Sequence, residues 1–406
     1  MSAILHSEGG AGVREAGATL KQPSFVVFSD DWGEHKSSSQ HLFNFVREQH
    51  AVLWVNTIGM RRPRLNAGDF RKALRKLSKM LDSSATPAGP IMKSHLTVSQ
   101  PRMLPFTNIS AVRRWNARSV IGEVRRQMGR LGLTRPVVVA TVPNACDYVG
   151  ELDASRVVYY CVDDFSAWPG LDSELVRAME NKLVARSDII LAASPTLRGR
   201  LAQSGKPTYL LPHGVDVELF SREVPFEHGC LTGIRAPRVG FFGLFDERSD
   251  QELIAALAGR MPGLSFVIAG PIETSTSLLR ACPNIHFTGR IPYGELPSFI
   301  SGLQALFIPY RADAFADTLA PLKLKEYLAT GKPVVSTPIA AACALADCIS
   351  IAASLDEWEA ALRNALTLQI GPRREQMRRR LADDSWARRA ETLVAFCGAG
   401  ATAGEE

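Results

Sequence analysis

The chain has 406 residues, of which 46% are hydrophobic and 22% are charged, and its formal net charge is +6 at pH 7. This length suits two domains, and the ordinary globular composition excludes a disordered, collagen-like or coiled-coil chain. No apolar run reaches the ~18 residues of a membrane-spanning helix, and residues 1–22 resemble a flexible tail rather than a secretory signal, so we expect a cytoplasmic protein.

In the first half, short apolar runs alternate with helix-like segments, as in parallel sheets with crossover helices. Ser37 and Gln40 have capping-box spacing at one helix start, and Gly205 suits a helix end. We predict an N-terminal domain over 23–216, with strands at 24–29, 51–56, 136–142, 156–162, 188–194 and 208–216 and helices at 37–50, 179–187 and 196–205.

The stretch 217–237 has mixed charge, two prolines, two glycines and no clear periodicity, and it predicts an interdomain linker. The alternation then restarts over 238–384 and predicts a second doubly wound domain, followed by a closing helix at 385–398 and a tail at 399–406. The expected fold is α/β, with two Rossmann-like domains facing a cleft. The second domain has predicted strands at 238–243, 265–270, 284–289, 305–310 and 332–337 and helices at 250–260, 295–303 and 321–330.

Ligands of open parallel sheets bind beyond the carboxyl ends of the strands, so the residues after each apolar run are candidates for a site. Glycine there allows close approach of a ligand to the backbone, although ordinary turn chemistry is the preferred explanation of a single glycine. Three glycines at successive strand ends are stronger evidence than one. Such residues in the second half are Gly243, Arg248, Gly270, Gly289, Arg290 and Ile291.

The segment 321–337 predicts a helix followed by a strand, with Leu322 and Lys323 at the helix start and Glu326 one turn later. A helix N-terminus and a lysine favour an anion, and a carboxylate can bind sugar hydroxyls, so a nucleotide diphosphate would fit here. The alternative is a solvated Lys–Glu pair.

The second half resembles the donor-binding domain of GT-B glycosyltransferases, on PLKLKEYLATGKPVVST and FTGRIPYGELPSFI. ASPTLRGRL and LLPHGVDVELF are similar to that superfamily's strand, helix and interdomain exit. More narrowly, FSDDWGEHKSSSQHLF, VLWVNTIGMR and VVYYCVDDFSAW resemble bacterial enzymes of exopolysaccharide and cell-wall polysaccharide assembly, including the xanthan glucuronosyltransferase type.

The resemblance assigns roles to several positions. It implies that Glu326 binds the ribose, that Lys323 contacts the diphosphate, and that the backbone of Arg290 and Ile291 contacts the base. The superfamily's first glutamate is replaced by Thr318, which argues against a retaining mechanism. We expect a nucleotide-sugar donor, preferably a UDP-sugar, with neither a cofactor nor a catalytic metal.

Asp163 and Asp164 follow the predicted strand 156–162, where a carboxylate can deprotonate an acceptor hydroxyl for an inverting displacement. The resemblance favours Asp163, and either Asp164 or Ser166 can instead cap the next helix. Asp31, Trp32, Gln40 and His41 are candidates for contacts with a saccharide acceptor, although His41 suits a structural role equally well.

The basic residues are concentrated in the first third of the chain: 61–79 has a local charge of +7 and 113–130 one of +5. Residues 70–81 predict an amphipathic basic helix, which can lie on an anionic leaflet or pack on the domain core. We expect membrane contact, through 61–79 and as a second candidate stretch through 113–130. Together with these basic stretches, the resemblance implies a transferase that moves a sugar to a saccharide or lipid-linked acceptor at the inner face of the plasma membrane. A nucleotide-sugar epimerase and a catalytically silent assembly partner are the alternatives, and sparse aromatics in the basic stretches disfavour nucleic-acid binding.

Overall fold

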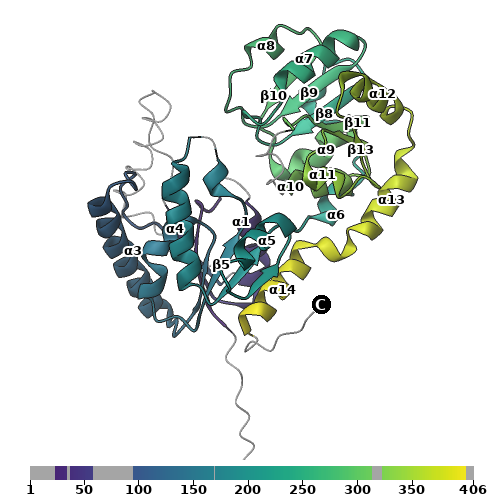
Figure 1. Ribbon diagram of the computed structural model, residues 1–406. Helices are drawn as coiled ribbons and strands as arrows, with labels where there is room; N and C mark the ends of the chain where they lie inside the picture. Colours follow the sequence, from purple (N-terminus) through teal and green to yellow (C-terminus); the bar gives the residue numbers. More distant parts are fainter. Residues whose placement is uncertain (1–22, 34–36, 58–94, 169, 313–321, 399–406) are drawn as a thin grey trace, which may run out of the picture.

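The computed structural model describes residues 23–33, 37–57, 95–168, 170–312 and 322–398. These residues form two sheet-and-helix domains, drawn in purple to teal and in green in Figure 1, and the yellow C-terminal helices run back from the second domain to the first. The expected α/β architecture with two Rossmann-like domains is confirmed.

The N-terminal domain is built on a seven-stranded, wholly parallel sheet with the strand order β3-β2-β1-β4-β5-β6-β7. Its central strands are buried along their whole length because helices cover both faces, which explains why they read as continuous apolar runs. The strands are β1 (Phe25–Ser29), β2 (Val52–Asn56), β3 (Leu96–Ser99), β4 (Val137–Ala140), β5 (Arg156–Cys161), β6 (Ile189–Ala192) and β7 (Thr208–Leu210).

Two elements of this domain are absent from the sequence prediction. The edge strand β3 is too short for a clear pattern, and α3 has only three buried residues, Asn116, Val120 and Val124, in 22 positions. The helices are α1 (Ser38–Gln49), α3 (Ser110–Leu131), α4 (Ser173–Arg186) and α5 (Pro195–Ala202), with short 3-10 turns η1 (Pro143–Asp147), η2 (Val149–Glu151) and η3 (Phe165–Ala167).

The C-terminal domain has a six-stranded parallel sheet with the order β10-β9-β8-β11-β12-β13. Its strands are β8 (Arg238–Phe242), β9 (Ser265–Ala269), β10 (Ile285–Gly289), β11 (Ala305–Ile308), β12 (Val334–Ser336) and β13 (Ser350–Ile351). Its helices are α7 (Gln251–Arg260), α8 (Ser277–Arg280), η5 (Tyr293–Glu295), α9 (Leu296–Ser301), α10 (Leu322–Ala329), α11 (Ala340–Cys343) and α12 (Leu355–Ala365).

The predicted linker contains ordered structure that its irregular sequence does not reveal. A short helix α6 (Val217–Phe220) is capped by Asp216, and a 3-10 turn η4 (Gly229–Leu231) places Leu231 in the core of the second domain. The prolines and glycines of this stretch interrupt any periodic pattern, so the sequence does not reveal the helix cap and the buried side chain that order it.

The chain returns to the N-terminal domain through α13 (Ile370–Arg380), η7 (Ala382–Asp384) and α14 (Trp386–Gly398). Trp386, Ala390, Leu393 and Cys397 of α14 pack in the same apolar cluster as strand β1 and helix α1 of the first domain. The last helix of the chain is therefore part of the first domain's core, so the two domains are joined by two chain crossings.

Candidate active site

The ends of three neighbouring strands of the C-terminal sheet contain glycines with positive φ: Gly243 at +123°, Gly270 at +134° and Gly289 at +75°. A Cβ on Gly270 would lie 2.0 Å from the carbonyl oxygen of Gly243, so Gly270 is required for the packing of the two loops. A Cβ on Gly243 would instead lie 3.0 Å from Nζ of Lys323. The absence of a side chain at Gly243 therefore leaves space in front of Lys323, whereas Gly270 lets its loop pack closely against the loop that contains Gly243.

Lys323 lies in the first turn of α10, and its Nζ is buried without a hydrogen-bond partner among the described residues. The ammonium lies 4.0 Å from the ring centre of Phe241 and 5.2 Å from that of Tyr310. Burial, with a smaller effect from the nearby charge of Arg248, lowers the pKa of Lys323 to about 7. A buried amine in this state gains most from an anion that supplies the missing acceptor.

Glu326 lies one turn after Lys323 and is 7% exposed. Burial raises the pKa of its carboxyl group to about 7, against the opposing effects of Lys323 and of a hydrogen bond from the Tyr293 hydroxyl at 3.3 Å. Two buried groups of opposite type, one turn apart and both titrating near neutral pH, are typical of a functional site.

Arg248 is held by Asp246, a residue that no motif in the sequence singles out. The Nε atom donates to both carboxylate oxygens at 2.8 and 3.0 Å, and the guanidinium lies 5.7 Å from the ring centre of Tyr310. Part of the charge of Arg248 is thus balanced within its own loop, and the side chain is fixed in place for an electrostatic interaction with Asp163 of the other domain.

Arg290 and Ile291 follow β10, and Arg290 is exposed while Ile291 packs partly on the domain core. Leu322 does not fit its predicted role, because its side chain packs against the apolar cluster of the N-terminal domain. Leu322 therefore contributes to the contact between the domains.

Asp163 follows β5 and faces the second domain, where Arg248 and Tyr310 feel its charge. One carboxylate oxygen accepts from the backbone N–H of Asp164 at 2.8 Å and the other from Nε1 of Trp168 at 3.1 Å. Burial raises the pKa of Asp163 to about 6, and these hydrogen bonds and Arg248 oppose that rise. A fixed carboxylate with this pKa suits a general base near neutral pH.

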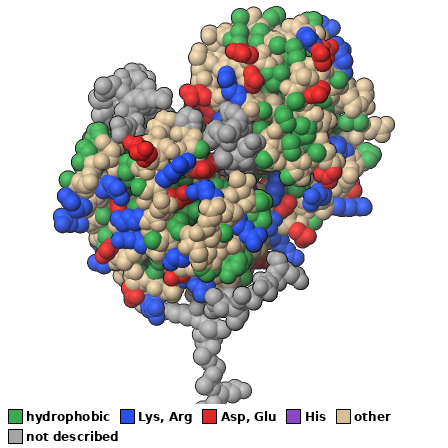
Figure 2. Space-filling model, viewed as in Figure 1, with side chains coloured by type: hydrophobic (Ala, Val, Ile, Leu, Met, Phe, Trp, Pro, Cys, Tyr) green, Lys and Arg blue, Asp and Glu red, His purple; other side chains and the backbone are tan. Residues whose placement is uncertain are grey.

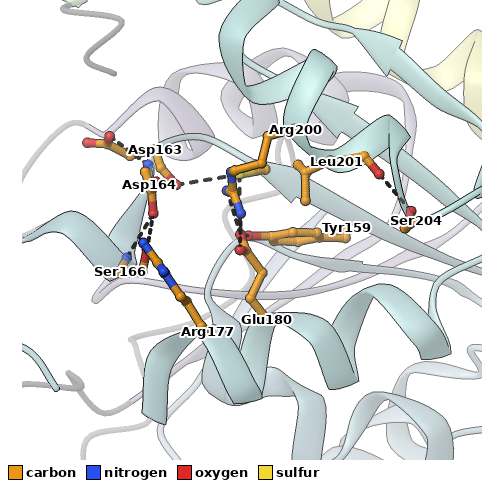
Figure 3. A network of polar contacts seen from close by, with 10 residues as sticks. Tyr159, Asp163, Asp164, Ser166, Arg177, Glu180, Arg200, Leu201 and Ser204 are labelled. Atoms are coloured by element: carbon orange, nitrogen blue, oxygen red, sulfur yellow. Dashed lines mark hydrogen bonds and ion pairs between the residues drawn. The ribbon is translucent and has the colours of Figure 1, made fainter. Parts of the chain in front are cut away.

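Asp164 points away from that position into a network of the N-terminal domain (Figure 3). Its Oδ1 accepts from the backbone N–H of Ser166 at 3.0 Å and from the Ser166 hydroxyl at 2.5 Å, which caps η3. The charge of Asp164 also acts on Arg200, which is paired with Glu180. Of the two predicted catalytic aspartates, the geometry favours Asp163 as the reacting group and gives Asp164 a structural role.

The loop after β1 is held together by Gln40. Its amide nitrogen donates to Asp30 at 2.8 Å and to the carbonyl of Asp31 at 3.1 Å, and its oxygen accepts from the backbone N–H of Gly33 at 2.9 Å. The expected acceptor contact of Gln40 is therefore replaced by a role in shaping the loop. The partly buried Trp32 ring rests edge-on against Trp54 at 4.7 Å, with Asp31 beside it.

His41 lies between the two domains. Its ring is stacked on Trp386 of α14 with centres 5.1 Å apart, and the same distance separates it from Tyr293 of the second domain. His41 is 6% exposed, so it acts as a packing residue of the interdomain contact, which is the structural alternative that the sequence left open.

Tyr293 is one of the residues of the site that sequence reasoning missed. It contacts His41 of the first domain and donates to Glu326 of the second. The signal was its position in FTGRIPYGE, directly after a strand end, but only the packing of η5 on α10 shows where its hydroxyl points. Tyr310, at the end of the β11 segment, was missed for the same reason.

The two basic stretches have different outcomes. Residues 61–79 lie outside the described residues, and 113–130 form most of α3. In the described ranges, no helix is both long and apolar enough to cross a bilayer, and no three His, Cys, Asp or Glu side chains come together as a candidate metal site.

Residues 236–367 match the family model described as "Glycosyl transferases group 1". TuaH of Bacillus subtilis (strain 168), which is described as a teichuronic acid biosynthesis glycosyltransferase, is 28% identical over 200 residues. That alignment covers 45% of the chain and 50% of TuaH, so the similarity spans about half the length of this curated relative.

Solved structures resemble the chain over nearly its whole length. Sucrose-phosphate synthase from Thermosynechococcus elongatus has a TM-score of 0.66 at 14% identity and covers 92% of this chain and 98% of its own. Anabaena HepE in complex with UDP and glucose has a TM-score of 0.61 at 12% identity, with 93% and 100% covered. At such identities the likeness establishes the fold, which is GT-B. The two sequence matches add a similarity to glycosyltransferases, over residues 236–367 for the family model and over 200 residues for TuaH.

Proposed function

We propose that the protein transfers a sugar from a nucleotide-diphosphate donor, preferably a UDP-sugar, to a saccharide acceptor in the synthesis of a bacterial surface polysaccharide. The observation that carries the proposal is the buried ammonium of Lys323 in front of Gly243, which has no hydrogen-bond partner in the part of the chain that the structure describes, with Glu326 one turn away. The diphosphate supplies the acceptor that the ammonium lacks, and the carboxylate of Glu326 accepts from the ribose hydroxyls.

In the proposed inverting step, an acceptor hydroxyl attacks the anomeric carbon while the bond from that carbon to the diphosphate oxygen breaks. The bond electrons leave with the nucleoside diphosphate, and the hydroxyl proton goes to the carboxylate of Asp163. Asp163 is supported as the base by its place opposite Arg248 and by the hydrogen bonds that fix both of its oxygens. Lys323 and Arg248 stabilise the negative charge that develops on the diphosphate.

The acceptor side is proposed to lie at the carboxyl edge of the N-terminal sheet, where Asp31, Trp32 and Asp163 follow β1 and β5. The relative's part in teichuronic acid biosynthesis supports a saccharide acceptor of the cell surface. A lipid-linked form of that acceptor, and a peripheral position at the inner face of the plasma membrane, belong to the same proposal.

The test is nucleoside diphosphate release measured with a panel of nucleotide sugars, with and without a saccharide acceptor. We expect acceptor-dependent release with one donor and at least a tenfold loss of donor affinity in Glu326→Gln. A nucleotide-sugar epimerase would convert its donor without any acceptor. Failure to bind any nucleotide sugar, with no effect of Glu326→Gln, would refute the proposal.

A further inference from the structure

Four large apolar side chains are exposed within twelve residues of the N-terminal domain. Leu104, Phe106, Ile109 and Trp115 are 40%, 49%, 47% and 46% exposed, and together they form what we call the apolar edge. Nine large hydrophobic side chains are exposed in the described parts of the chain, and four of them are gathered here. Single exposed apolar residues are ordinary, whereas a group of them indicates a binding surface.

The loop of the apolar edge is anchored to α3 by the side chain of Asn116. The side chain of Asn116, 3% exposed, accepts from the backbone N–H of Leu104 at 2.8 Å and donates to its carbonyl at 2.9 Å. Met103 and Thr107 are buried, so the loop alternates between side chains that anchor it and side chains that point outward. The exposure of the apolar edge is therefore built into the loop and does not result from loose packing.

Arginines without acidic neighbours flank the apolar edge. From Gln100 to Gly122 the sequence has four arginines and neither Asp nor Glu. Arg113 is paired with Asp147, whereas Arg102, Arg114 and Arg118 are exposed. Arg114, Trp115 and Arg118 lie on one face at the start of α3, and Figure 2 shows Lys and Arg side chains next to hydrophobic ones on the flank that α3 forms.

The position of the apolar edge relates it to the acceptor side of the cleft. The loop follows the carboxyl end of β3, and parallel strands bring that end to the same edge of the sheet as the end of β5, where Asp163 lies. Four strand-to-strand steps separate β3 from β5, or about 19 Å at ~4.8 Å for each step. A saccharide anchored by its lipid in a membrane at the apolar edge can therefore reach Asp163.

We propose that the apolar edge inserts into the interface of an anionic lipid bilayer, with Arg102, Arg114 and Arg118 against the headgroups. Tryptophan and other large apolar side chains beside exposed arginines fit the boundary between headgroups and acyl chains. This proposal rests on the proposed function only for the identity of the acceptor that the membrane would present. The proposal also limits the role of the basic stretch 113–130, because the far end of α3 lies away from this edge.

That limit provides a matched control. Arg130 lies 16 residues beyond Arg114, about 24 Å along the helix at ~1.5 Å per residue, which exceeds the ~8–10 Å screening distance in physiological salt. Phe226, 64% exposed and in the linker, is the control for an apolar side chain. Arg130→Ser and Phe226→Ser should therefore leave membrane binding unchanged.

The experiment is flotation of the full chain with vesicles of 30% phosphatidylglycerol in phosphatidylcholine, and with pure phosphatidylcholine, at 0.05 and 0.3 M salt. We expect binding to the anionic vesicles that weakens with salt. The double change Phe106→Ser and Trp115→Ser should reduce partitioning at least tenfold, and Arg114→Ser with Arg118→Ser should reduce it by roughly fivefold per arginine at low salt. The two control variants should stay within twofold of the unmodified protein.

A second measurement tests insertion directly. Brominated lipids should quench the fluorescence of the unmodified protein, and Trp115→Phe should remove most of that quenching.

The proposal would be overturned if the unmodified protein did not bind anionic vesicles, or if the control variants lost as much binding as the variants of the apolar edge. A concentration-dependent dimer that Phe106→Ser dissolves would assign the edge to a second copy of the chain instead. Nucleotide binding by thermal shift should be unaffected in all variants, which separates this proposal from the proposed donor site.

Discussion

The ammonium of Lys323 lies 3.0 Å from the point that a Cβ on Gly243 would occupy. The two residues come from different elements, the start of α10 and the end of β8, and are 80 positions apart in the chain. Their proximity means that the missing side chain of Gly243 leaves room directly beside the buried ammonium of Lys323, between a strand end and a helix start.

Gly243→Ala should weaken nucleotide binding at least tenfold. The new Cβ approaches Nζ and Cε of Lys323 at 3.0 and 3.2 Å, and a φ of +123° is unfavourable for alanine. Gly205→Ala is the control, because Gly205 has a φ of +72° and no atom within 4 Å of the point where its Cβ would lie. Both variants should lose stability, and titration calorimetry with UDP should show the loss of affinity only for Gly243→Ala.

Lys323→Met should raise the thermal stability of the ligand-free protein while abolishing its stabilisation by UDP. The native pKa of about 7 lies below the ordinary value of 10.5, so the buried amine disfavours folding most strongly below pH 7, and that penalty disappears as the pH rises toward 10.5. Melting temperatures of both proteins between pH 6 and 9.5 measure this.

The control is Lys332→Met. Lys332 is buried at the other edge of the sheet, and its amine donates to the carbonyl of Leu303. Burial also lowers the pKa of Lys332, to about 8, but its removal leaves that carbonyl without its partner. Lys332→Met should therefore raise stability less than Lys323→Met and should leave the response to UDP intact. Equal behaviour of the two lysine variants would contradict the assignment of Lys323.

The transfer rate should fall about tenfold per pH unit below pH 6. Asp163 must be ionised to accept a proton, and burial raises its pKa to about 6. Because this folded-state pKa lies above the ordinary 3.8, the contribution of Asp163 to stability is largest below pH 4 and is lost as the pH rises through 6. Asp163→Asn should therefore abolish transfer and keep donor affinity. The stability of this variant minus that of the unmodified protein should be more favourable at pH 7.5 than at pH 4.5.

Asp164→Ala should behave in the opposite way. It removes the acceptor for the backbone N–H and hydroxyl of Ser166 and with it the cap of η3, at a cost of about 1–2 kcal/mol of unfolding free energy. Chemical denaturation should show this loss, and a substantial transfer rate should remain. A complete loss of transfer with unchanged stability would make Asp164 the base.

Tyr293→Phe should weaken donor binding by a few fold without unfolding the protein. The change removes the hydrogen bond at 3.3 Å that opposes the raised pKa of Glu326, but it retains the ring that packs against His41. The apparent pKa of Glu326 in the pH dependence of UDP affinity should rise. Tyr293→Ala, which also removes the ring, should destabilise the contact between the domains and reduce the melting temperature.

The sequence alone determined the two-domain α/β fold, because buried parallel strands read as apolar runs and because the breakers between them mark the loops. It also indicated Lys323, Glu326 and Asp163, since each lies at a strand end or a helix start where parallel sheets bind ligands. Local patterns of this kind are encoded within a few neighbouring residues and need no knowledge of distant contacts.

The tertiary structure decided which candidate side chains lie between the domains with a charged group available and which pack against other side chains or hold a loop together. Asp163 and Asp164 are adjacent and chemically identical. The Ser166 hydroxyl donates to Asp164, whereas the charge of Arg248 acts on Asp163. Leu322 and His41 became interdomain packing residues, and Tyr293 became a partner of Glu326, through contacts between residues that are tens to hundreds of positions apart. Direction and burial depend on such distant neighbours, and no local pattern in the sequence contains them.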